Sequence, residues 1–143
     1  MTVSAAQVDL IIFIGQPGPS PVERAVAGIR QAAALDLVSL AQACDRIGRV
    51  VAVVADGTIA DRLRGTSREA PATTPVHVDL DAAAEPFHFG RRLASVIERF
   101  SIRHAVYFGA GAAPLLSPHT LTRLCDTLLA QPAAGPGTGT GVV

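Results

Sequence analysis

Four short apolar segments, separated by stretches of helical character, restrict the fold of this chain more than any other feature. They are Val8–Ile14, Val50–Val54, Val76–Leu80 and His104–Phe108, and the first two are almost continuously apolar. Short runs of this kind are typical of strands that are buried on both faces of a parallel sheet. Strands that alternate with helices predict βαβ units with right-handed crossovers. We therefore expect a three-layer α/β/α fold, in which helices cover both faces of a mostly parallel sheet.

Helix-start signals mark two of the intervening stretches. Ser20-Pro21-Val22-Glu23 has the pattern of a capping box with proline at the first helical position. The pattern predicts a helix that runs from there toward Ile47, with a break near Asp36 and a stop at Gly48. Ser117-Pro118 predicts the start of the last helix in the same way.

Two more helices are predicted from hydrophobic spacing. A short helix is expected around Ile59–Arg64, followed by a polar link over Gly65–Pro75. An amphipathic helix is expected over Phe89–Phe100, because its apolar residues recur at helical intervals.

The length of 143 residues suits one domain, which we place at residues 1–130. Residues 131–143 are rich in Gly, Pro and Thr and are expected to be a disordered tail.

Composition excludes several function classes. Apolar residues make up 49% of the chain, the net charge is zero, and no apolar run is long enough to span a membrane, so we expect neither a membrane nor a nucleic acid as a partner. The N-terminal segment lacks the features of a signal peptide, and a cytoplasmic location is expected.

All twelve basic residues are arginine, which excludes a lysine-dependent P-loop. Cys44 and Cys125 are expected to be buried thiols, and no metal ligands are predicted.

Three predicted strands end in glycine or turn residues. These ends are Gly15–Gly18, Asp56-Gly57 and Gly109–Ala113. Ligands of open parallel sheets bind at the carboxyl ends of the strands, and glycine lets a ligand approach the main chain. The other interpretation is that βα turns simply favour Gly and Pro. Asp56 either contacts a ligand or caps the turn before Thr58.

The order of these elements resembles the nucleotide-binding half of the GT-A nucleotidyltransferases, the MobA-like NTP-transferase group. The resemblance covers Val8–Ala130. It rests on the following segments: Val8–Gly18, Val50–Asp56, Pro86–Leu93 and Val106–Pro118.

The resemblance implies an NTP as ligand, and neighbouring first and fourth strands whose turns meet at one crevice. Gly15, Gln16 and Gly18 would pack against the nucleotide. The implied base and phosphate contacts are Phe87, His88, Phe89 and Gly90 for the base, and Gly109, Ala110, Gly111 and Pro114 for the ribose and phosphates.

The resemblance also implies Mg²⁺ as a cofactor, but the chain departs from the family here. Ala112 stands where the family has a metal-binding Asp, and no Lys is present to balance the phosphates, although Arg24 or Arg30 could reach them. Nucleotidyl transfer depends on such charges. We therefore expect nucleotide binding with impaired nucleotidyl transfer, and no catalytic residue is assigned.

Two alternatives remain. One is a non-catalytic interaction module of the same fold, which forms a homodimer or binds a partner at an exposed edge of the fourth strand. The other is a fragment of a sugar-nucleotide glycosyltransferase that uses Asp79 and Asp81 as a metal-binding pair. A solvated strand end would explain the same two carboxylates.

Overall fold

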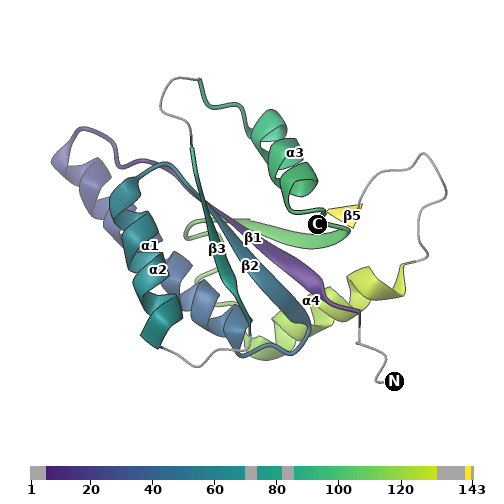
Figure 1. Ribbon diagram of the computed structural model, residues 1–143. Helices are drawn as coiled ribbons and strands as arrows, with labels where there is room; N and C mark the ends of the chain where they lie inside the picture. Colours follow the sequence, from purple (N-terminus) through teal and green to yellow (C-terminus); the bar gives the residue numbers. More distant parts are fainter. Residues whose placement is uncertain (1–5, 70–73, 82–85, 132–140, 143) are drawn as a thin grey trace.

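A computed structural model describes residues 6–69, 74–81, 86–131 and 141–142, in which helices and strands alternate along the chain (Figure 1). In chain order the elements are β1 (Val8–Ile14), α1 (Pro21–Gln42), β2 (Ile47–Val54), α2 (Gly57–Glu69), β3 (Val76–Leu80), α3 (Phe89–Arg99), β4 (His104–Gly109), α4 (Pro118–Ala130) and β5 (Gly141–Val142).

The strands form one parallel sheet in the order β3-β2-β1-β4-β5. β1 lies in the middle, where Leu10 is aligned with Val50 of β2 and Val106 of β4. The prediction that the first and fourth strands are neighbours is therefore confirmed. β5 has two residues and pairs with the start of β4, and sequence patterns did not predict a strand there.

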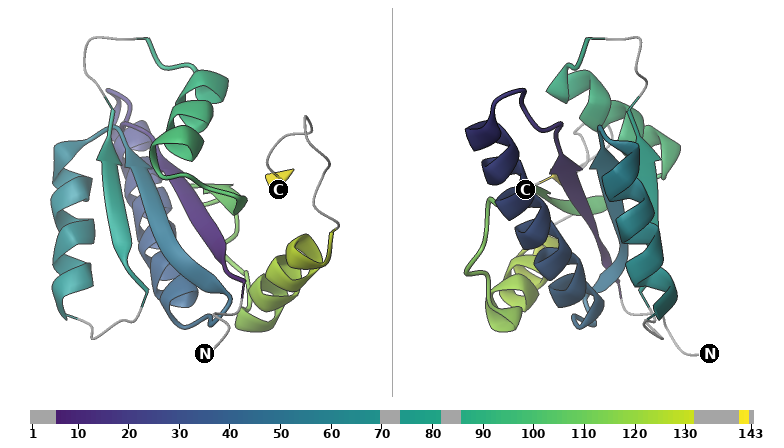
Figure 2. Two further views of the ribbon diagram at one scale, coloured as in Figure 1. Left: turned by 45° about the vertical axis from the view of Figure 1, so that its right-hand side comes forward. Right: turned by 90° about the vertical axis from the view of Figure 1, so that its left-hand side faces the viewer.

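Helices cover both faces of the sheet, so the predicted three-layer α/β/α arrangement is confirmed. α1, α2 and α4 pack on one face through a large apolar cluster, and α3 packs on the other face through a smaller one (Figure 2). The central strands supply residues to both clusters, because successive side chains of a strand point to opposite faces. Leu10 and Ile12 belong to the first cluster, and Ile11 belongs to the second.

Two helix boundaries differ from the prediction. α1 runs unbroken to Gln42, and Asp36 lies exposed on its outer side, where a carboxylate does not disturb the helix. Gly48 does not end a helix, because it lies within β2. α2 continues through Gly65 to Glu69, well beyond the predicted end at Arg64.

The two halves of α1 differ in burial. Its buried residues begin at Ala34, in the second half of the helix. Val22 and Ile29, in the first half, are large apolar residues that are mostly exposed. Only the second half of α1 is therefore anchored in the core.

Candidate functional site

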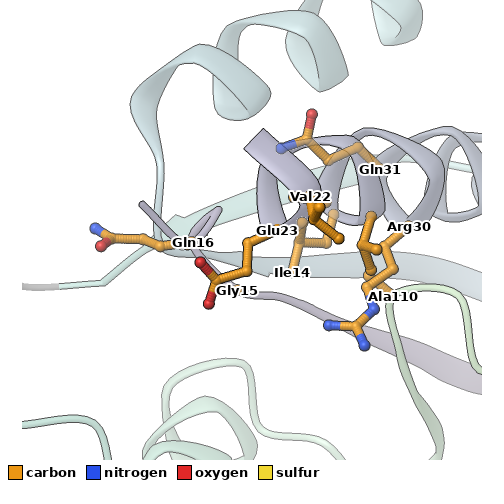
Figure 3. Close-up of a pocket in the computed structure, with 11 residues that line it drawn as sticks. Ile14, Gly15, Gln16, Val22, Glu23, Arg30, Gln31 and Ala110 are labelled. Atoms are coloured by element: carbon orange, nitrogen blue, oxygen red, sulfur yellow. The ribbon is translucent and has the colours of Figure 1, made fainter. Parts of the chain in front are cut away.

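Two pockets flank the segment Gly15–Gln16, where β1 leaves the sheet. We name them the α1 pocket, which residues of α1 help to line, and the α3 pocket, which includes Phe87 in the segment just before α3. The α1 pocket has a volume of about 370 Å³ and is lined by Ile14, Gly15, Gln16, Gly18, Val22, Glu23, Val26, Ala27, Arg30, Gln31 and Ala110 (Figure 3). The α3 pocket has a volume of about 530 Å³ and is lined by Phe13, Ile14, Gly15, Gln16, Val53, Ala55, Gly57, Leu80, Asp81 and Phe87. Both volumes are within the usual range for small-molecule sites.

The loop between β1 and α1 is held by the capping box that the sequence predicts. The amide of Glu23 donates to Oγ of Ser20 at 3.1 Å, and the amide of Ser20 donates to Oε2 of Glu23 at 2.9 Å. These bonds to Ser20 lower the pKa of the Glu23 carboxyl. A Cβ on Gly18 would lie 2.5 Å from Cδ of Glu23. Gly18 is therefore required for the helix start to close in this way.

The α1 pocket brings the β1 and β4 turns together. The amide of Ala110 donates to the carbonyl of Phe13 at 2.8 Å, which ties the start of the β4 turn to the end of β1. Gly111 has a φ of +79°, and a Cβ there would lie 3.0 Å from Cγ of Arg30. The β4 turn thus runs close to Arg30, and a larger residue at position 111 would be unfavourable both in backbone conformation and in space.

Arg30 supplies the only guanidinium among the residues that line the two pockets in the described part of the chain. Figure 3 shows its side chain passing Ala110, with the guanidinium reaching to the same side of α1 as the Glu23 carboxylate. Among the described residues it has no hydrogen-bond or ion-pair partner. Arg24, the other candidate, instead donates to the carbonyl of Pro19.

The α3 pocket has apolar and aromatic walls. Phe87 is 62% exposed and Leu80 is 49% exposed, so both present apolar surface at this pocket. Gln16 also lines this pocket, and its Nε2 donates to the carbonyl of Ala55 at 3.1 Å. This bond connects the β1 turn to the β2 turn. A flat apolar ligand in this pocket would therefore meet the exposed ring of Phe87 and the hydrogen-bonded side chain of Gln16.

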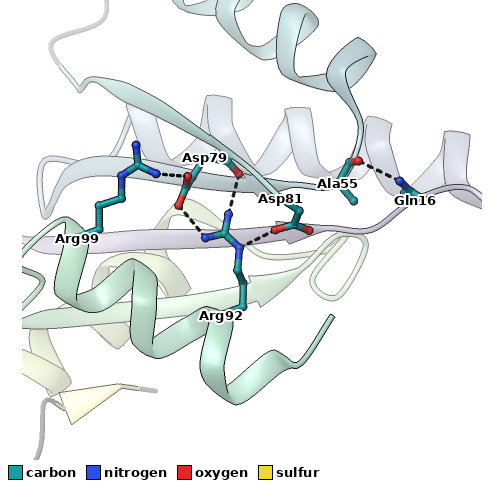
Figure 4. Close-up of polar contacts among 6 residues, drawn as sticks. All are labelled: Gln16, Ala55, Asp79, Asp81, Arg92 and Arg99. Atoms are coloured by element: carbon teal, nitrogen blue, oxygen red, sulfur yellow. Dashed lines mark hydrogen bonds and ion pairs between the residues drawn. The ribbon is translucent and has the colours of Figure 1, made fainter. Parts of the chain in front are cut away.

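Four charged residues join the end of β3 to α3 (Figure 4). Asp79 is only 3% exposed and accepts from Arg92 at 3.0 Å and from Arg99 at 2.7 Å. Arg92 also donates through Nε to Asp81 at 2.6 Å. Burial disfavours the charged guanidinium of Arg92, but the bonds to Asp81 and then Asp79 outweigh it and raise its pKa. The Asp79 and Asp81 pair is thus neutralised by arginines within the fold.

The structure brings some of the predicted site residues together and leaves others aside. Gly15 and Gln16 line both pockets, Gly18 and Ala110 line the α1 pocket, and Phe87 lines the α3 pocket. The predicted residues that line neither pocket are Asp56, His88, Phe89, Gly90, Gly109, Gly111 and Pro114. Residues of the β1 and β4 turns thus meet in the α1 pocket, whereas Phe87 lines the second pocket, which shares Gly15 and Gln16 with the first.

Asp56 and His88 have local roles instead. Oδ1 of Asp56 accepts from the amide of Thr58 at 2.6 Å, as one of the two interpretations expected. Nδ1 of His88 accepts from the amide of Arg91 at 3.3 Å and caps α3. Both side chains satisfy amides at a helix start that would otherwise lack a partner.

Several lining residues were not singled out from the sequence. Phe13, Val22, Val26 and Leu80 were all assigned to strands or helices and not to the site. Leu80 is the last residue of β3, on the same face as Val76 and Val78, and spacing along the chain does not predict that it is exposed.

In residues 6–69, 74–81, 86–131 and 141–142, no group of three or more His, Cys, Asp or Glu could hold a metal ion. No helix in the same residues is long and apolar enough to cross a bilayer.

The fold and the pockets define an α/β domain whose candidate site lies at the carboxyl edge of a parallel sheet. Comparison of the sequence with protein-family models and with curated proteins gave no match.

Proposed function

We propose that the chain is a nucleotide-binding domain of the nucleotidyltransferase type, with the base in the α3 pocket and the phosphates toward the α1 pocket. The observation that carries the proposal is the pair of pockets on either side of Gly15–Gln16. This segment follows β1, whose two neighbours in the sheet are β2 and β4. Ligands of open α/β sheets bind at such a reversal of strand order.

The chemistry of the two pockets suits the two parts of a nucleotide. A base stacks on aromatic side chains, and Phe87 offers an exposed ring at the α3 pocket. A phosphate favours guanidinium groups, and Arg30 lies in the α1 pocket. Gly15, between them, has nothing within 4 Å of the position of a Cβ, so the main chain is open to a ligand.

Binding rather than efficient transfer is the activity we propose. Ala112 replaces the carboxylate that the resemblance implies for the metal, and the chain contains no lysine. Loss of one well-placed electrostatic partner reduces catalytic rates by about 10²–10³-fold. The glycosyltransferase alternative is less favoured, because a metal at Asp79 and Asp81 would have to displace Arg92 from both carboxylates.

Thermal unfolding with nucleotides tests the proposal. Each of the four common ribonucleotides, as mono-, di- and triphosphate, is added to the purified chain, since a ligand of the native state raises the melting temperature. We expect at least one to stabilise the protein. Phe87→Ala should weaken its affinity by about tenfold, because stacking on one base contributes about 1–3 kcal/mol.

Leu115→Ala is the matched control, because Leu115 is 95% exposed and lines neither pocket. It should leave nucleotide affinity unchanged. If no nucleotide raises the melting temperature, the proposal is wrong.

An interaction module is the second candidate. Val22, Val26 and Ile29 follow one another at helical spacing on α1, and all three are exposed. Exposed apolar side chains that lie together often mark protein interfaces. Concentration-dependent self-association in sedimentation, reduced by Ile29→Asp, together with no response to nucleotides would favour this candidate.

A further inference from the structure

We infer that the site binds its nucleotide without a divalent cation, with Arg30 as the cation, and that it prefers mono- or diphosphates to triphosphates. This inference rests on the proposed function. It departs from what the resemblance implies, because the residues present do not fit Mg²⁺.

Among the described residues, each carboxylate near the two pockets already accepts a hydrogen bond through one of its oxygens. Oε2 of Glu23 accepts from Ser20 at 2.9 Å, and Oδ1 of Asp81 accepts from Arg92 at 2.6 Å. Oδ1 of Asp56 accepts from the amide of Thr58 at 2.6 Å. Mg²⁺ prefers oxygen ligands in near-octahedral geometry and is usually held by one or two carboxylates in addition to phosphates. With Ala112 in the β4 turn, no carboxylate in the described part of this edge is placed for that task.

Arg30 is placed to neutralise phosphate charge in place of a divalent cation. Its stem packs beside the β4 turn, since a Cβ on Gly111 would lie 3.0 Å from its Cγ and 3.6 Å from its Cα. Arg30 lines the α1 pocket together with Gly15 and Ala110. A guanidinium presents its N–H groups in the geometry that phosphate oxygens accept, and it stays charged at all working pH values.

The charge of the α1 pocket limits the number of phosphates. Glu23 lines the same pocket, and a glutamate carboxylate is ionised at neutral pH. The positive charge of Arg30 is therefore opposed by one negative charge. Each additional phosphate adds negative charge that the pocket does not neutralise, and a short phosphate chain is the better match.

Calorimetry on the full chain tests the inference. The ribonucleotide that stabilises the protein most is titrated as mono-, di- and triphosphate, once with EDTA and once with MgCl₂. We expect the Kd of the mono- or diphosphate to change by less than about twofold between the two buffers and to be lower than that of the triphosphate in EDTA. Arg30→Gln should weaken binding by about tenfold or more, since hydrogen bonds to charged groups are the strong ones.

Two further variants sharpen the test. Arg123→Gln, on the exposed side of α4, removes the same charge away from the pockets and should leave the Kd unchanged. Ala112→Asp adds a carboxylate to the β4 turn, and it should weaken binding in EDTA and make it respond to MgCl₂.

The outcomes separate the two proposals. If no nucleotide binds in either buffer, the proposed function is wrong and the inference falls with it. If a nucleotide binds but Mg²⁺ tightens binding to the wild-type chain by tenfold or more, only the inference is wrong. The inference alone is also wrong if Arg30→Gln and Arg123→Gln bind the nucleotide with equal Kd.

Discussion

Asp79 offers the sharpest test of how α3 is held on the sheet. It is 3% exposed, and its two carboxylate oxygens accept from Arg92 and Arg99. Asp79→Asn keeps the size of the side chain, but it removes the charge and turns an N–H₂ group toward a guanidinium. The variant therefore tests the ion pairs with little change in packing.

The expected loss in the free energy of unfolding follows from the exposure of the two arginines that pair with Asp79. Arg99 is 66% exposed and can turn to water, so its share is that of a surface pair, about 0–1 kcal/mol. Arg92 is mostly buried and keeps only Asp81 as a charged partner, and breaking a fully buried pair costs about 3–5 kcal/mol. Because Arg92 retains one partner, we expect a loss of about 2–4 kcal/mol in the free energy of unfolding.

Urea unfolding, followed by far-UV circular dichroism, measures this loss as a lower midpoint with an unchanged slope. Asp61→Asn is the matched control, because Asp61 pairs with Arg64 on the exposed side of α2 and should cost less than about 0.5 kcal/mol. A loss below about 1 kcal/mol for Asp79→Asn would refute the reasoning. Loss of Mn²⁺ binding without loss of stability would instead favour the glycosyltransferase alternative.

Two further predictions concern α1 and α4. Gly18→Ala should destabilise the chain by about 1–2 kcal/mol, because the new Cβ displaces Glu23 from the capping box. Gly28→Ala is the control: Gly28 lies at an exposed helix position with open space around a Cβ, so the change should stabilise the chain by about 0.5–1 kcal/mol. Equal effects of the two changes on urea unfolding would contradict this reasoning. Burial, and then Cys44, raises the pKa of the Cys125 thiol from 9.0 to about 11. Between these pH values the thiol ionises in the unfolded chain but stays neutral in the folded one, so the free energy of unfolding falls as the pH rises. The wild-type chain should lose about 2–3 kcal/mol more than Cys125→Ala over this interval, and parallel pH profiles would contradict the prediction.

The layers of the fold could be predicted because the signals are local and redundant. The buried run in β1 and the capping box before α1 each specify an element without reference to the rest of the chain. The end of α1 could not be predicted in this way. The turn between Gln42 and Ile47 contains no Gly or Pro. Gly48 lies in β2 at an irregularity of its pairing with β1, where Ile47 is aligned with Val8 and Arg49 with Asp9, and glycine is common at such bulges.

The site could be predicted only in outline. Parallel strands place the turns after β1 and β4 at one edge, so the proximity of Gly15 and Ala110 follows from strand order. Asp56 and His88 were less predictable, because a polar side chain at a helix start can serve either a ligand or the helix itself. The pairing of Asp79 with Arg92 depends on how α3 returns over the sheet, which spacing along the chain does not specify.

The central position of β1 has a consequence for local stability. Leu10, Ile11 and Ile12 are fully buried, with strands on either side and helices above and below. Their amide protons can exchange with solvent only when the whole domain opens. The first half of α1, which has no buried residue, can fray while the sheet stays intact. Hydrogen exchange should therefore be slowest in β1 and fast in the first half of α1. The α1 pocket is thus lined by a rigid strand end on one side and by a more mobile helix on the other.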